Sequence, residues 1–134
     1  MIVDKIVFIS SAIIKNENQE ILLLKRSKLN KTYKNYWQLP EGKIQIDESP
    51  KEALYREIKE ELSCEVIESA LKRIISNSAT LKNVHYLLVR VIFETKIKGK
   101  IKLDSEHLSY KWLPKENAVK NLKLIVGTKE AINL

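Results

Sequence analysis

The segment from Val84 to Thr95 constrains the fold more than any other part of the chain. Both of its alternating sets of side chains are largely apolar: Val84, Tyr86, Leu88 and Ile92 form one set, and Leu87, Val89, Val91 and Phe93 form the other. A strand with this pattern is buried on both faces, so we expect it in the middle of a sheet that is covered on both sides.

The remaining periodic segments predict the partners of this strand. Apolar runs at 5–14 and 21–25, separated by the polar residues 15–18, predict a hairpin. Further extended segments are expected at 43–46, 66–75, 101–103 and 109–113, and helical spacing at 114–124 and 126–132 predicts a C-terminal helix. Together with one helix in the first half, this order predicts an α/β (α+β) fold with a mixed sheet between helices.

That first helix has a clear start. Ser49 suits the N-cap position, Pro50 suits the first helical turn, and Glu52 is placed to complete a capping box. We expect the helix to continue to about Leu62.

On a helical wheel drawn at 100° per residue, acidic residues lie beside the apolar stripe of this helix. Leu54, Ile58 and Leu62 form the stripe, while Glu57 and Glu61 fall at its margin, where an unpartnered carboxylate is costly. A Mg²⁺ ion, which prefers oxygen ligands, would resolve this conflict. The alternative is a surface helix whose acids pair with Lys51, Arg56 and Lys59.

A wider pattern surrounds these acids. Gly42 is followed after five residues by Glu48 and after seven more by the run Arg56-Glu57-Ile58-Lys59-Glu60-Glu61. This spacing resembles the Nudix box, G-x5-E-x7-R-E-U-x-E-E-x-G-U with U a bulky aliphatic residue, and 37–40 (Trp-Gln-Leu-Pro) precede it as in many members. Ser63 and Cys64 depart from the closing Gly and aliphatic positions, and Glu41 replaces a Gly often found before the box.

The resemblance implies a Nudix-like α/β/α sandwich with a mixed central sheet and the box loop and helix, formed by residues 1–134 as a single domain. It also implies Mg²⁺, or Mn²⁺ as a substitute, bound by Glu57, Glu60, Glu61 and the backbone carbonyl of Glu41. Arg56 is expected to orient a helix carboxylate, with Glu48 and Gly42 as supporting residues. The general base is expected to be a box glutamate or a later carboxylate, for which Glu106 is favoured over Asp104.

Substrate contacts are expected from basic and aromatic residues near the box. Lys25, Arg26 and Lys43 are candidates for phosphate binding, although a solvated surface role is the alternative for each. Trp37, with Tyr33 and Tyr36, is a candidate for stacking on a base, and Trp37 would also suit the core. His85 and His107 are interpreted as ordinary polar residues.

Composition limits the functional classes. The net charge of +7 favours polyanionic ligands, and the single cysteine, Cys64, excludes an internal disulfide framework. The apolar run at 6–9 is too short to cross a membrane and no cleavage site follows it, so the cytoplasm is the expected location.

The expected function is hydrolysis of a nucleoside diphosphate joined to a group X. By elimination of subfamily markers, the favoured substrates are (d)NTPs, including damaged or noncanonical ones, cleaved to a nucleoside monophosphate and pyrophosphate. The alternatives are other derivatives, such as dinucleoside polyphosphates or nucleotide sugars, and a non-catalytic module that binds nucleic acid. The expected partner is a small nucleotide rather than a membrane or nucleic acid, and the expected state is a monomer or a homodimer.

Overall fold

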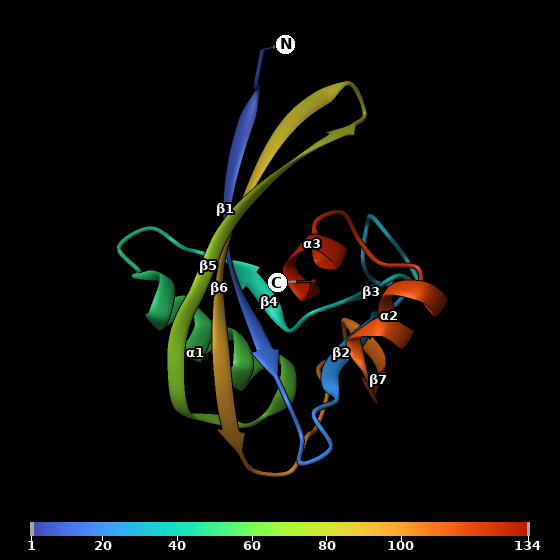
Figure 1. Cartoon of the computed structure of the whole chain (residues 1–134). Coiled ribbons are helices and arrows are strands. Elements are labelled where there is room, and N and C mark those ends of the chain that lie inside the picture. Colours follow the sequence, from blue (N-terminus) through green and yellow to red (C-terminus); the bar gives the residue numbers. More distant parts are fainter. Residues whose placement is uncertain (1, 134) are drawn as a thin grey trace.

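The computed structural model describes residues 2–133, which form seven strands and three helices (Figure 1). The first half contains β1 (Lys5–Ile14), β2 (Ile21–Arg26), β3 (Trp37–Gln38), β4 (Glu41–Lys43) and α1 (Pro50–Leu62). The second half contains β5 (Glu65–Leu81), β6 (Val84–Lys98), β7 (His107–Leu113), α2 (Lys115–Asn121) and α3 (Thr128–Ile132). No helix among the described residues is long and apolar enough to cross a membrane.

The strands form two sheets. The larger one has the order β4-β1-β6-β5 and is mixed, because β1 runs parallel to β6 while the other pairs are antiparallel. The smaller one has the order β3-β2-β7 and is antiparallel. The expected mixed central sheet is therefore confirmed, and the doubly apolar segment lies in β6, between β1 and β5.

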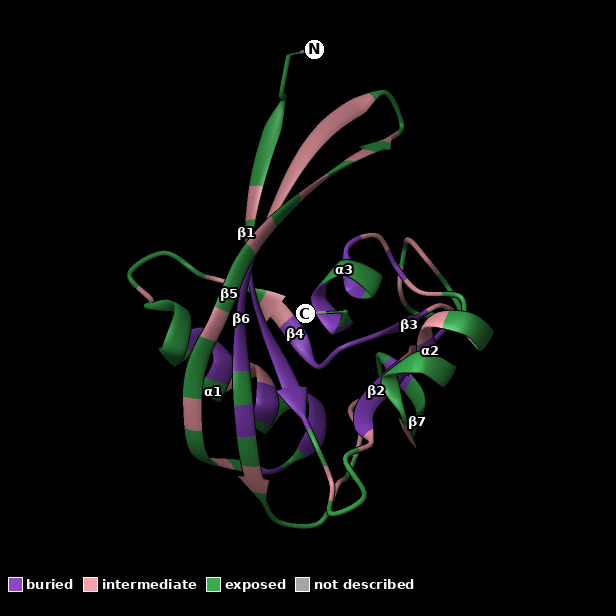
Figure 2. Ribbon diagram, viewed as in Figure 1, coloured by how far each residue is buried: buried purple, intermediate pink, exposed green. Residues whose placement is uncertain are grey.

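The core has two parts, one on each side of β6. Val91 and Phe93 pack in a cluster with the α1 residues Leu54 and Ile58, while Ile92 packs in a second cluster that includes the C-terminal helices. Because neighbouring residues of β6 contact helices on opposite faces of the sheet, the structure has an α/β/α arrangement. Residues 84–89 of β6 are only partly buried, because the start of β1 and the β5–β6 hairpin extend beyond the helices (Figure 2).

The hairpin expected from residues 5–14 and 21–25 is wrong. The chain does reverse there, and Asn16 Oδ1 accepts the backbone N–H groups of Asn18 and Glu20 in the turn. However, β1 and β2 then diverge into different sheets and share only the bridge between Lys15 and Ile21. β1 pairs with β6 from Lys5 to Ile14, and β2 pairs with β7 from Ile21 to Arg26, so the main partner of each strand lies in a distant part of the chain.

Other boundaries also differ from expectation. Residues 101–103 are irregular rather than a strand, because Ile101 and Leu103 pack against the α1 core while the N–H of Lys102 donates to the carbonyl of Leu62. The segment expected at 43–46 is replaced by β4, three residues long and starting at Glu41. The expected C-terminal helix is two short helices, since residues 123–125 between them hydrogen-bond to both backbone groups of Trp37.

Candidate active site

The box residues form a compact unit between β4 and α1. The capping box is present as expected: Ser49 Oγ accepts the N–H of Glu52 at 3.1 Å, and Glu52 Oε1 accepts the N–H of Ser49 at 2.9 Å. At the other end Ser63 has a φ of 58°, so it adopts the left-handed conformation that a glycine usually supplies. The helix therefore ends normally despite the atypical residue.

Gly42 is held directly against the carboxylate of Glu57. A Cβ atom at position 42 would lie 2.0 Å from Glu57 Cδ and 2.1 and 2.4 Å from its two oxygens. Position 42 therefore has no room for a side chain, and the glycine allows a carboxylate of the helix to pack against the end of the sheet.

Arg56 ties the acids to one another. Its Nε and Nη2 donate to the two oxygens of Glu48 at 2.7 and 3.0 Å, Nη2 also donates to the carbonyl of Lys43 at 2.9 Å, and Nη1 donates to Glu57 Oε1 at 2.6 Å. The contact with Glu60 is longer, at 3.4 Å, and the Glu60 side chain is 56% exposed. The hydrogen bond from Arg56 lowers the pKa of Glu48 to about 2 and raises the pKa of Arg56 itself.

Glu61 is the most buried acid of the helix, with 5% of its surface exposed. Its Oε1 accepts the backbone N–H of Glu41 at 3.0 Å. Burial raises the pKa of Glu61 well above its ordinary value, and the negative charges of Glu57, Asp104 and Glu41 raise it further. Burial likewise raises the pKa of Glu57, against the opposing effect of Arg56.

His107 lies beside Glu61, a position that the sequence did not predict. Its Nδ1 lies 2.7 Å from Asp104 Oδ1, and its Nε2 lies 3.8 Å from Glu61 Oε2 without a hydrogen-bond partner among residues 2–133. The contact with Asp104 fixes the orientation of the imidazole, so that Nε2 lies on the side of Glu61. The available signal was the spacing of three between Asp104 and His107, immediately before a strand.

Glu106, the favoured candidate for the general base, is exposed next to this pair. Its negative charge contributes to the raised pKa of Glu57. Its backbone carbonyl accepts the N–H of Ser27, which anchors the segment before β7 to the end of β2.

The side chain of Glu41 is buried. Arg90 Nε and Nη2 donate to its two oxygens, each at 3.1 Å, and Ser11 Oγ donates to Oε1 at 2.7 Å. Arg90 was not predicted as a site residue. The available signal was a single charge in the doubly apolar strand.

The basic candidates occupy different environments. Arg26 is half-buried, donates to Gln38 Oε1 and to the carbonyl of Thr32, and has a pKa lowered by burial against the attraction of Glu41, Glu106 and Glu61. Lys25 is partly exposed at the end of β2, and the Lys43 side chain is exposed above the carbonyl that Arg56 binds.

Trp37 is a correction to the expected base-stacking set. Only 7% of its surface is exposed, because it packs in the core with Leu39 and Ala131. Lys111 Nζ covers its ring, 5.3 Å from the centroid. Tyr33 and Tyr36 are more exposed, but they pack on each other edge to face at 5.4 Å.

The donor set has the chemistry of a site for a hard divalent cation. Burial raises the pKa values of both Glu57 and Glu61. Glu57 is paired with Arg56 at 2.6 Å, whereas Glu61 has no lysine or arginine within ion-pair distance among residues 2–133, so its negative charge is the one that lacks a countercharge. Across residues 2–133, no three acidic, histidine or cysteine side chains converge closely enough in this arrangement to hold a metal ion. The fit therefore rests on the chemistry of the carboxylates and the uncompensated charge of Glu61.

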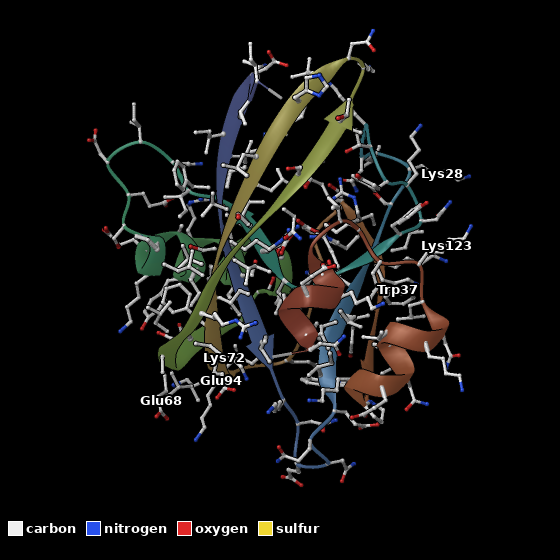
Figure 3. The ribbon with its side chains drawn as sticks, turned by 45° about the horizontal axis from the view of Figure 1, so that its top comes forward. Lys28, Trp37, Glu68, Lys72, Glu94 and Lys123 are labelled. Carbon is white, nitrogen blue, oxygen red and sulfur yellow. The ribbon has the colours of Figure 1, made fainter. Side chains whose placement is uncertain are left out.

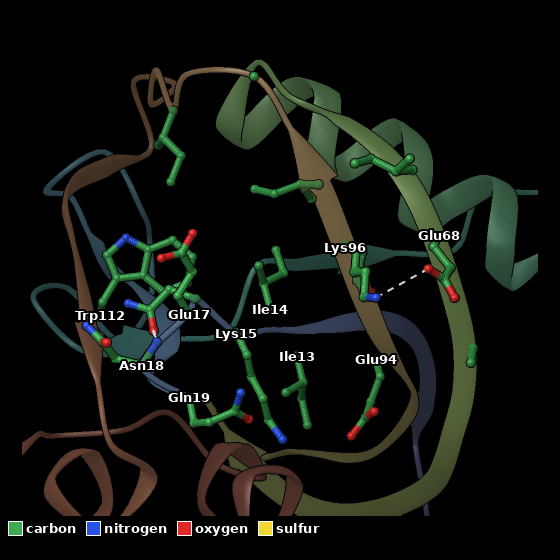
Figure 4. A pocket seen from close by; sticks show the side chains of 17 residues that line it. Ile13, Ile14, Lys15, Glu17, Asn18, Gln19, Glu68, Glu94, Lys96 and Trp112 are labelled. Carbon is green, nitrogen blue, oxygen red and sulfur yellow. Dashed lines mark hydrogen bonds and ion pairs between the residues drawn. The ribbon is translucent and has the colours of Figure 1, made fainter.

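The large surface cleft lies elsewhere. A cleft of about 1010 Å³ opens between the turn after β1 and the paired ends of β5 and β6 that lie away from their hairpin turn (Figure 4). Trp112 and Ile14 line it, together with a mixture of acidic and basic side chains, and none of the box acids does.

Comparisons of the sequence with a family model and with individual proteins identify the same family. The model of the NUDIX domain matches residues 9–133. An RNA pyrophosphohydrolase of Marinomonas sp. (strain MWYL1) is 44% identical over 50 residues, and the putative nudix hydrolase 1 of Caenorhabditis elegans is 34% identical over 70 residues. These matches cover 37% and 48% of this chain but only 28% and 19% of the two relatives.

Solved structures match over nearly the whole chain. The MutT protein from Methanosarcina mazei Go1 superposes with a TM-score of 0.80 at 26% identity, covering 99% of this chain and 94% of that one. A MutT NUDIX hydrolase from Burkholderia pseudomallei shares the fold, with a TM-score of 0.77 at 22% identity over 96% of both chains.

Proposed function

This chain belongs to the Nudix hydrolase family, and from that premise we propose that it hydrolyses the diphosphate linkage of nucleoside diphosphate derivatives with Mg²⁺, or with Mn²⁺ as a substitute. The observation that supports this most directly is Glu61, a buried acid with three further acids around it and a strongly raised pKa. Glu57, Glu60 and Glu61, with the carbonyl of Glu41, would hold the metal. When bound, a divalent ion neutralises the phosphate oxygens and increases the acidity of a water.

Side chains and backbone groups of the protein supply the other functions of the site. Arg56 fixes the carboxylate of Glu57, and the N–H of Glu41 fixes that of Glu61. Arg26, Lys25 and Lys43 attract the phosphates, and Glu106 is proposed as the general base. Glu106 accepts a proton from the water whose oxygen bonds to phosphorus while the bond to the leaving phosphate breaks.

The proposed substrates are (d)NTPs, including damaged or noncanonical ones, with a nucleoside monophosphate and pyrophosphate as products. The name of the Marinomonas relative and the net charge of +7 favour a second candidate, hydrolysis of pyrophosphate on RNA. Dinucleoside polyphosphates and nucleotide sugars are further candidates of the same chemistry. We propose a single domain over residues 1–134, in the cytoplasm, as a monomer or a homodimer.

A substrate panel tests this proposal. Phosphate and pyrophosphate release are measured with Mg²⁺ on (d)NTPs, oxidised nucleotides, dinucleoside polyphosphates, nucleotide sugars and triphosphorylated RNA. We expect Glu60→Gln or Glu61→Gln to lower turnover by about two orders of magnitude or more while the fold persists, since each removes a metal ligand.

Three results would contradict the proposal. Near-normal rates in both variants would contradict the assignment of Glu60 and Glu61 as metal ligands. An inactive wild type that binds RNA in a salt-sensitive way would indicate the non-catalytic module instead. A thermal stability unaffected by Mg²⁺ and Mn²⁺ would leave α1 as an acidic structural helix.

A further inference from the structure

Arg90 and Glu41 form a buried ion pair that the box does not contain. Arg90 is 1% exposed and Glu41 is 7% exposed, and both oxygens of the carboxylate accept hydrogen bonds from the guanidinium at 3.1 Å. Such a pair contributes little net stability, because removing two charges from water costs about as much as their attraction returns. Its presence at the residue next to Gly42 therefore suggests a role in the site.

Glu41 links this pair to the helix acids. Its side chain is held by Arg90 and Ser11, and its backbone N–H donates to Glu61 Oε1 at 3.0 Å. The other oxygen of Glu61 has only the 3.8 Å contact with His107. The orientation of the Glu61 carboxylate thus depends mainly on where the backbone of Glu41 is held.

The guanidinium is itself confined from the opposite side. A Cβ atom on Gly127, at the start of α3, would lie 1.9 Å from Arg90 Nη1, so the backbone of the C-terminal segment packs directly on Arg90. Arg90 therefore lies between α3 and β4 with little freedom to move. A lysine has one point charge in place of the planar fork and would hold the Glu41 carboxylate less rigidly.

We propose that Arg90 is a positioning residue for Glu61, acting through Glu41, and that it sets the affinity of the acidic cluster for a divalent cation. This inference rests on the proposed function. Residues that support metal ligands typically change metal affinity or activity by about 10- to 100-fold when they are replaced. We expect a change of that size from a side chain that contacts neither the metal nor the nucleotide.

The test compares Arg90→Lys and Arg90→Met with wild type in two measurements. The first is Mn²⁺ affinity without nucleotide, from the loss of the free-ion electron paramagnetic resonance signal, and the second is kcat and KM on the best substrate of the panel. We expect about 10-fold or greater loss of Mn²⁺ affinity and a lower kcat at saturating metal, with KM for the nucleotide unchanged. A raised KM with unchanged Mn²⁺ affinity would overturn the proposal in favour of direct substrate contact.

A second set of variants separates positioning from folding. Glu41→Gln combined with Arg90→Met removes both buried charges, which should restore stability lost in Arg90→Met alone. We expect Mn²⁺ affinity to stay low in this double variant, and its recovery together with stability would overturn the proposal. In a Glu61→Gln background, Arg90→Lys should cause no further loss of Mn²⁺ affinity, whereas a full additional loss would show that Arg90 acts elsewhere.

Two controls lie outside the site. Lys72→Ala removes an exposed ion pair, 2.8 Å long, between β5 and Glu94 of β6, the strand that also carries Arg90, and should leave Mn²⁺ affinity unchanged (Figure 3). Ile75→Ala removes core packing at the residue of β5 that lies opposite Arg90, and it should lower stability while leaving Mn²⁺ affinity unchanged. If wild type and Glu61→Gln behave as proposed but the Arg90 variants bind Mn²⁺ normally, only this inference fails. If wild type neither binds metal nor hydrolyses any substrate, the proposed function fails as well.

Discussion

Replacing Gly42 with alanine should inactivate the protein without unfolding it. The φ of Gly42 lies outside the left-handed region, so alanine can adopt the same backbone conformation. The added Cβ would meet Glu57 Cδ at 2.0 Å, whereas ordinary contact begins at 3.4 Å. The carboxylate must therefore move by about 1.4 Å, and its 2.6 Å hydrogen bond from Arg56 is lost or rebuilt in another geometry.

The size of the effect follows from that displacement. A misplacement of about 1 Å can cost about 100-fold in rate, which corresponds to about 2.7 kcal/mol of activation free energy. The free energy of unfolding should change much less, because alanine gains about 0.4–1 kcal/mol by restricting the unfolded chain and thereby offsets part of the lost contact.

The assay measures kcat for Mg²⁺-dependent hydrolysis together with urea denaturation. Gly99→Ala is a matched control: its φ of 115° makes alanine strained, but the added Cβ would lie 3.6 Å from Cys64 Sγ and far from the acids. We expect lost stability with normal kcat for Gly99→Ala, and the reverse for Gly42→Ala. A Gly42→Ala enzyme with wild-type kcat would refute the steric reasoning.

Three further predictions concern stability. Ser49→Ala removes the N-cap acceptor of α1 and should lower the free energy of unfolding by about 1 kcal/mol in urea denaturation; an unchanged midpoint would contradict the cap. Trp37→Ala should cost about 3–5 kcal/mol because the ring is in the core, and a loss below 1 kcal/mol with a raised KM would instead support base stacking. Without metal, Glu57 and Glu61 bind protons more tightly in the folded than in the unfolded chain, so thermal stability in EDTA should increase as pH falls through their raised pKa values toward 4.5. Below pH 4.5 the stability contributed by Glu48, whose folded pKa is about 2, should be lost as that group is protonated. A stability that falls steadily from pH 8 to 4.5 would contradict the raised pKa values of Glu57 and Glu61.

Local patterns predicted the parts of the structure that depend on neighbours in sequence. The capping residues Ser49 and Glu52 and the apolar stripe of α1 are present as expected, because hydrogen bonding within one turn and burial of one helix face decide them. The strand expected to be buried on both faces lies between β1 and β5 as expected, but only its residues 90–93 are continuously buried. Strand pairing was not predictable in this way. Residues 5–14 and 21–25 have the pattern of a hairpin, and only the competition between distant partners sends them into two sheets.

The same distinction between local and long-range contacts applies to the residues of the site. The spacing of Glu57 and Glu61 was visible in the sequence, whereas Arg90 and His107 come from elements whose position depends on the completed fold. Trp37 shows the converse error: an aromatic residue next to a binding motif can equally be a core residue, and only its burial distinguishes the two.

The buried contacts of Glu41 also determine the order in which the protein becomes functional as it folds. α1 is stabilised by local contacts and can form early, but Ser11 and Arg90 meet Glu41 only when the first strand of the chain has paired in parallel with β6. Pairing between segments so far apart in sequence is slow, because the entropy of closing a long loop is lost before the contacts form. During refolding, the helical circular dichroism signal should therefore return before metal binding does, and the interval between them measures the formation of the central sheet.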